Sequence, residues 1–175
     1  MSAPSTRGNV ERMVEMHLVG VRVEMPTNSP IVLLREAQGQ HRVLPIFIGP
    51  VEATAIAFAQ NGVVTARPLT HDLLRDLLLA LGVGVDRIVI TELRDRTFYA
   101  EIEMTTNGSD YKVSSRPSDA IALAARLGTP IFADEAVLDE AGVTMSEDED
   151  EEQDDDEVER FREFLEGVNP EDFAS

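Results

Sequence analysis

The chain has 175 residues, enough for one domain with a buried core, and its lack of cysteine excludes disulfides, thiol catalysis and thiolate metal sites. The net charge of −18 is concentrated at one end, because residues 146–175 carry −13 and residues 1–145 only −5. The longest apolar run, residues 77–85, is too short to span a membrane and no signal peptide is evident, so we expect a soluble cytoplasmic protein.

Hydrophobic periodicity and turn residues predict the secondary structure. The expected elements are, in chain order, strands at 14–25, 31–34 and 42–48, helices at 50–60 and 70–81, strands at 87–93, 97–104 and 111–114, a helix at 117–127, a strand at 130–132 and a short helix at 134–139. Three strands, two helices, three strands, a helix, a strand and a helix indicate an α+β fold. We expect a mixed, largely antiparallel sheet with helices packed on it, forming one compact domain over residues 14–140.

Local signals refine these elements. A change of phase at Leu18-Val19 predicts a β-bulge in the first strand, and Pro45 places the third strand at an edge or a bulge. Thr70 is the expected N-cap of the second helix, whose leucines repeat at intervals of three and four residues. Asn107-Gly108 predicts a tight hairpin turn.

Both ends of the chain differ in composition from the central domain. Residues 1–13 are expected to be a disordered N-terminus, and residues 141–157 an acidic linker. Residues 158–175 predict a short amphipathic helix and tail. The apolar stripe of that helix should dock on its own domain or on a neighbouring subunit.

Two helix starts share one pattern. Residues 67–72 read Arg-Pro-Leu-Thr-His-Asp, and residues 116–119 read Arg-Pro-Ser-Asp. In both, an Arg-Pro step precedes an acid and then an apolar helical run. The repetition predicts two similar corners that bind an anion or a metal, and we expect them to converge on one phosphate pocket.

These corners, together with residues 43–53 (Val-Leu-Pro-Ile-Phe-Ile-Gly-Pro-Val-Glu-Ala), resemble the bifunctional nuclease domain family in order and spacing. The resemblance covers about residues 14–140. The acidic run and residues 161–173 resemble the C-terminal extension of bacterial members. The resemblance implies a compact α+β domain that forms a homodimer or higher homo-oligomer and acts on DNA and RNA.

Phosphodiester hydrolysis requires an activated water and relief of negative charge, usually supplied by one or two divalent metals. Three acids fall in first helical turns and are the predicted ligands of Mg2+ or Mn2+: Glu52, Asp72 and Asp119. Arg67 and Arg116 would bind the phosphate. His71, beside Asp72, is the predicted general acid or base, so the expected catalytic residues are His71, Asp72 and Asp119.

The same residues also suit purely structural roles. Acids in a first helical turn complement the helix dipole without any catalytic role, and each arginine can simply neutralise a nearby acid. Glu101 and Glu103 lie two apart on one strand, where a solvated sheet face is the simpler interpretation. A non-catalytic oligomeric module that binds an anion or an acidic partner is therefore the alternative to a nuclease of low sequence specificity.

Charge argues against nucleic-acid binding by the chain as a whole, because that affinity comes mainly from cationic contacts. The tail of −13 would repel DNA, or lie over an arginine-lined groove as a competing anion. The second possibility predicts that truncation of residues 146–175 raises nucleic-acid affinity.

Overall fold

The structure, a computed structural model, describes residues 12–144. In chain order its elements are β1 (Met13–Glu24), β2 (Ser29–Glu36), β3 (Arg42–Phe47), α1 (Pro50–Gln60), α2 (Thr70–Ala80), β4 (Gly84–Arg94), β5 (Thr97–Thr106), β6 (Ser109–Ser115), α3 (Pro117–Leu127), β7 (Ile131–Asp134), α4 (Glu135–Ala141) and β8 (Val143–Thr144). No helix among the described residues is long and apolar enough to cross a membrane.

All eight strands join one sheet in the order β6-β5-β4-β7-β1-β2-β3-β8. Neighbouring strands are antiparallel except β4 and β7, which are parallel. Two meanders, β1-β2-β3 and β4-β5-β6, are thus joined edge to edge by the four residues of β7. Within residues 12–144, one mixed sheet with four helices in a single domain confirms the predicted α+β class.

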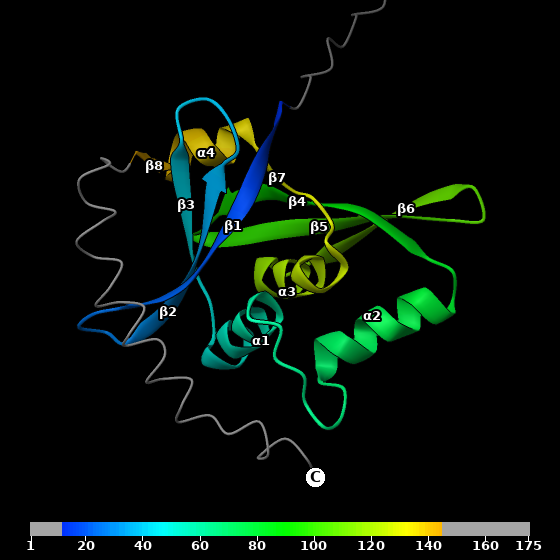
Figure 1. The fold of residues 1–175 in the computed structure, drawn as a ribbon. Helices are drawn as coiled ribbons and strands as arrows, with labels where there is room; N and C mark the ends of the chain where they lie inside the picture. The colour runs from blue at the N-terminus through cyan, green and yellow to red at the C-terminus, as the bar shows by residue number, and fades with distance from the viewer. Residues whose placement is uncertain (1–11, 145–175) are drawn as a thin grey trace, which may run out of the picture.

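The helices cover the sheet unequally. In Figure 1, α1, α2 and α3 lie on one face of the sheet and α4 lies on the other. Small side chains let α1 and α3 pack closely, since Ala53–Phe58 of α1 and Ala120–Ala124 of α3 are buried throughout. Large buried side chains of the strands and of these two helices fill the core: Leu34, Leu44, Ile56, Ile88, Ile90, Ile121 and Leu123.

Helix α2 packs less completely than its leucine pattern suggests. His71 is its one buried residue. Leu74 and Leu78 pack against the core, but the leucines on the flanks of the helix are largely exposed: Leu73, Leu77, Leu79 and Leu81. The periodicity predicted the helix, but neighbouring elements cover only part of its apolar surface.

The local strand signals agree with the structure. The pairing of β1 with β2 shifts register between Leu18 and Gly20, which is the predicted bulge. Pro45 pairs with β2 at a position that β8 does not reach, so its missing N–H faces an open edge. The β5–β6 turn is Asn107-Gly108, with both φ angles positive. The β4–β5 turn also has two positive φ values, 50° at Asp95 and 61° at Arg96.

The domain extends slightly beyond the predicted boundaries, residues 14 and 140, at both ends. Met13, assigned to the disordered N-terminus, begins β1, and β8 lies in the segment assigned to the acidic linker. The pairing of β8 needs only backbone groups at the free edge of β3, so composition gave no sign of it. The remaining N-terminal residues, the acidic run and the predicted helix after residue 157 lie outside the described residues.

Candidate active site

The starts of α1 and α3 lie next to each other on the helical side of the sheet (Figure 1). Both begin with extended N-cap residues, Gly49 and Arg116, followed by a proline at the first helical position. In neither helix does an N-cap side chain accept a hydrogen bond from a backbone N–H of the first turn. Glu52 and Asp119 occupy the first turns of their helices, as the sequence predicted, and the structure adds that these two helices are adjacent.

Arg116 joins these two carboxylates. Its Nε donates to Asp119 Oδ2 at 2.7 Å and its Nη2 to Asp119 Oδ1 at 3.1 Å, while Nη2 also lies 3.0 Å from Glu52 Oε1. Hydrogen bonds and charge attraction from Asp119, with a further contribution from Glu52, raise the pKa of Arg116. The side chain remains 65% exposed. Its Nη1 bonds to no other described residue, so this nitrogen is available to a ligand.

His71 reaches the same cluster from α2. Its Nε2 lies 2.9 Å from Asp119 Oδ1, and its side chain is only 10% exposed. Burial acts to raise the pKa of Asp119, but hydrogen bonds from Arg116 and His71 outweigh burial and lower it. A carboxylate that stays ionised holds an imidazole in one orientation, as in known acid–base pairs. We call these four residues, Glu52, His71, Arg116 and Asp119, the Arg116 cluster.

Asp72 belongs to a different network. Its Oδ1 accepts from Arg126 Nε at 2.6 Å, and its Oδ2 accepts the Leu69 N–H at 2.9 Å. Leu69 is thus the N-cap, and Thr70, the predicted cap, is the first helical residue. Burial acts to raise the pKa of Asp72, yet the bonds from Arg126 and Leu69 lower it overall.

Arg126 ties three helices together behind this pair. Its side chain is 5% exposed, and its Nη1 donates to Ala55 O of α1 at 3.0 Å and to Ala122 O of α3 at 2.9 Å. Because it also binds Asp72 at the start of α2, Arg126 fixes the helix that carries His71. The sequence analysis missed Arg126, since Asp72 and Ala55, its partners in the other helices, lie far away in the chain.

The two predicted corners converge only in part. His71 and Asp72 are consecutive in a helix, so their side chains point about 100° apart, and here His71 bonds to Asp119 whereas Asp72 bonds to Arg126. Arg67 is exposed, and no described residue contacts its side chain in a hydrogen bond or an ion pair. The Arg116 cluster therefore contains Glu52, His71, Arg116 and Asp119 but neither Asp72 nor Arg67.

The predicted metal ligands do not form a shared site. Within residues 12–144 there is no group of three His, Asp or Glu side chains arranged to hold a metal ion. Glu52 and Asp119 both bind Arg116, and Asp72 binds Arg126. The residues present thus do not fit the expected Mg2+ or Mn2+ set of Glu52, Asp72 and Asp119.

An open groove of about 710 Å3 borders Arg116. Ile46, Phe47 and Phe98 contribute to its apolar wall, and the starts of α1 and α3 reach it. Among the described residues that line it, the charged ones are Arg96 and Arg116, and none is acidic. The sequence analysis missed Arg96, although an arginine beside Asp95 in a two-residue turn, where glycine is preferred, was a visible signal.

Comparison with known proteins agrees with the resemblance seen in the motifs. The bifunctional nuclease domain pattern matches residues 32–146, which include the whole Arg116 cluster. A Mycobacterium tuberculosis protein named as uncharacterized is 51% identical over 167 residues, covering 93% of this chain and 99% of that protein. Bifunctional nuclease 2 of Oryza sativa is 26% identical over 123 residues, 69% of this chain and 38% of the rice protein. Bifunctional nuclease 1 of Arabidopsis thaliana is 26% identical over 105 residues, 58% of this chain and 32% of the plant protein. The chain belongs to the bifunctional nuclease domain family.

Proposed function

We propose that this protein is a nuclease that hydrolyses phosphodiester bonds in DNA and RNA with low sequence specificity. The observation that carries the proposal is the convergence of Glu52, His71 and Asp119 around the exposed Arg116, beside a groove whose lining residues within 12–144 include no acid. Membership of the family and the names of the plant relatives support the same activity. Arginine contacts to phosphate carry no sequence information, which favours low specificity.

The proposed roles follow from position and charge. Arg116 donates to the scissile phosphate from Nη1, while Asp119 and Glu52 hold its guanidinium in place. Water attacks the scissile phosphorus while His71, oriented by Asp119, takes its proton; the P–O bond to the leaving oxygen breaks, and that oxygen takes a proton from solvent. Asp72 acts at a distance, since its bond to Arg126 fixes the start of α2 beside His71. No step is assigned to a metal ion, because the described residues do not fit one.

The test is cleavage of labelled single-stranded DNA and RNA by the purified full chain, with Mg2+, with Mn2+ and with chelator. Asp119→Asn removes the charge that holds both Arg116 and His71, so we expect activity to fall about 10²–10⁴-fold, the usual contribution of a positioned acid–base group. Activity that persists in Asp119→Asn contradicts the assignment.

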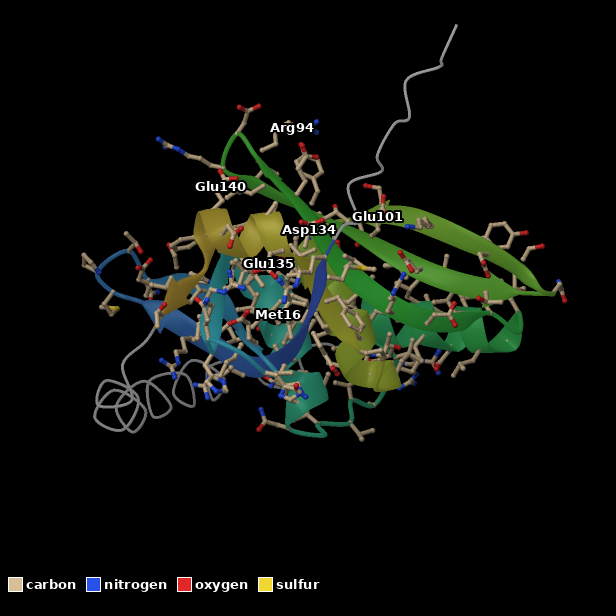
Figure 2. The ribbon with its side chains drawn as sticks, turned by 90° about the horizontal axis from the view of Figure 1, so that it is seen from above. Met16, Arg94, Glu101, Asp134, Glu135 and Glu140 are labelled. Carbon is tan, nitrogen blue, oxygen red and sulfur yellow. The ribbon has the colours of Figure 1, made fainter. Side chains whose placement is uncertain are left out.

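The matched control is Glu103→Gln. The Glu103 carboxylate is half as exposed as that of Asp119, 14% against 30%, and is likewise paired, with Arg87 and Lys112. It lies on the other face of the sheet, the side viewed in Figure 2, where the neighbouring acid Glu101 is labelled. We expect this variant to cleave like the wild type, which separates loss of the site from general loss of stability.

A second candidate function is a non-catalytic anion-binding module. The observation that favours it is that Asp72 and Asp119 are both occupied by arginines, which suits structural ion pairs as well as catalysis. Such a module binds oligonucleotides through Arg116 without cleaving them under any metal condition. Binding by the wild type, lost in Arg116→Gln, together with no cleavage, selects this function over the nuclease.

A further inference from the structure

We propose that the groove beside Arg116 binds a single-stranded stretch of nucleic acid, with an unpaired base against Phe47 and phosphates at Arg96 and Arg116. The inference rests on the proposed function in that it assigns the substrate of the same site. It adds two residues, Phe47 and Arg96, that neither the sequence nor the comparisons connected to a ligand.

Phe47 is an exposed aromatic ring on the wall of the groove. It is the last residue of β3, and alternation turns it outward while Ile46 beside it is only 3% exposed. Phe47 itself is 62% exposed, although a ring of this size is normally packed. Aromatic side chains stack on nucleic-acid bases of any sequence, provided that the base is not already paired. The ring therefore favours single strands.

Arg96 occupies a backbone position that disfavours an arginine. Both central residues of the β4–β5 turn have positive φ, the conformation for which Asn-Gly is preferred. The β5–β6 turn of the same sheet uses that pair, Asn107-Gly108. An arginine at a position where glycine is easier favours a role for its side chain. That side chain lines the groove, and no other described residue bonds to it or forms an ion pair with it.

The charges at the groove suit a polyanion with an apolar component. Arg96 and Arg116 come from different parts of the chain, the β4–β5 turn and the start of α3, and both line the same groove. Glu52 and Asp119 sit behind Arg116 and do not line the groove. The lining thus offers guanidinium N–H donors beside aromatic and aliphatic carbon, and a nucleotide with an unpaired base presents the complementary phosphate and ring.

The experiment measures binding of phosphorothioate-linked oligonucleotides in chelator, so that neither metal-dependent nor metal-independent cleavage intervenes. Fluorescence anisotropy compares a labelled single-stranded oligonucleotide with the same sequence as a duplex, using the full chain. We expect Phe47→Ala to weaken single-strand binding about tenfold, while Phe47→Trp restores it and duplex binding is unaffected. Tyr111→Ala is the matched control, because Tyr111 is also an exposed aromatic, at 51%, but lies outside the groove.

Arg96→Gln is expected to lower the slope of log affinity against log salt by roughly 0.7, the loss of one phosphate contact on a single strand. Arg94→Gln is its control, since Arg94 lies two residues away in the same hairpin but faces the α4 side of the sheet (Figure 2). We expect no change of slope in Arg94→Gln. Thermal melts of all variants establish that each is folded.

The outcomes separate the inference from the proposed function. Binding that depends on Phe47 and Arg96 without any cleavage under metal conditions supports the inference and overturns the nuclease. Cleavage or binding that Phe47→Ala leaves unchanged overturns the inference alone. A reduction in Tyr111→Ala as large as the reduction in Phe47→Ala does the same. A peptide of residues 147–157 that binds the groove when oligonucleotides do not overturns both and identifies an acidic segment as the ligand.

Discussion

Replacing Arg126 by methionine tests the claim that this residue holds α1, α2 and α3 together. The side chain is 5% exposed and its partner Asp72 22% exposed, so the change leaves a mostly buried carboxylate without its cation and removes one donor to Ala55 O. Removing one partner of a buried pair costs about 3–5 kcal/mol, and residual hydration of Asp72 favours the lower end. We expect a loss of about 3 kcal/mol, equivalent to roughly 10 °C in Tm for a domain of this size.

Urea unfolding at pH 7 measures the loss, and a double-mutant cycle with Asp72→Asn isolates the pair. In the Arg126→Met background, Asp72→Asn should leave the free energy of unfolding unchanged or raise it. The expected coupling energy between Arg126 and Asp72 is about 2 kcal/mol. The control is Arg87→Met. The Arg87 side chain is 36% exposed, and its partner Glu103 remains paired with Lys112 after the substitution. That variant should lose about 1 kcal/mol or less. Equal losses for Arg126→Met and Arg87→Met, or strictly additive effects, refute the reasoning.

Three further predictions concern acid, the tail and self-association. Because the pKa of Asp119 is lowered in the folded state, its contribution to stability is present above about pH 4 and is lost as pH falls through the lowered pKa. The free energy of unfolding should therefore fall less steeply with decreasing pH in Asp119→Asn than in the wild type. Parallel curves for the two proteins contradict this. Deleting residues 146–175 removes a charge of −13, so nucleic-acid affinity should rise and its salt dependence steepen; unchanged binding isotherms exclude a masking role. If exposed leucines of α2 join copies of the chain, light scattering should give the wild type the mass of a dimer or a larger assembly. Leu77→Glu should then have a smaller mass, and equal masses for the two proteins refute the contact.

The sequence was informative wherever a local rule decides the structure. Proline at the first helical position located the starts of α1 and α3, and so placed Glu52 and Asp119 in equivalent first turns. Alternation and Asn107-Gly108 predicted the strands and one hairpin. The α+β class followed from the order of these elements.

What the sequence could not predict depends on packing between distant segments. Asp72 is paired with Arg126, 54 residues away, and that choice follows from how three helices meet. The exposure of Leu77 depends on which neighbours cover α2, which periodicity does not encode. The groove is assembled from separate segments that include the β4–β5 turn and the start of α3, so its position emerges only with the complete sheet.

The position of β7 has a consequence for synthesis of the chain. Each meander pairs locally and can form as soon as its own residues leave the ribosome, but Ile131–Asp134 is the segment that pairs with both β1 and β4. Until those four residues emerge, each meander presents an unpaired inner strand to other nascent chains. Chains interrupted before residue 131 should therefore be recovered as aggregates, and completion of the central strand should mark the point at which the growing protein becomes independent of chaperones.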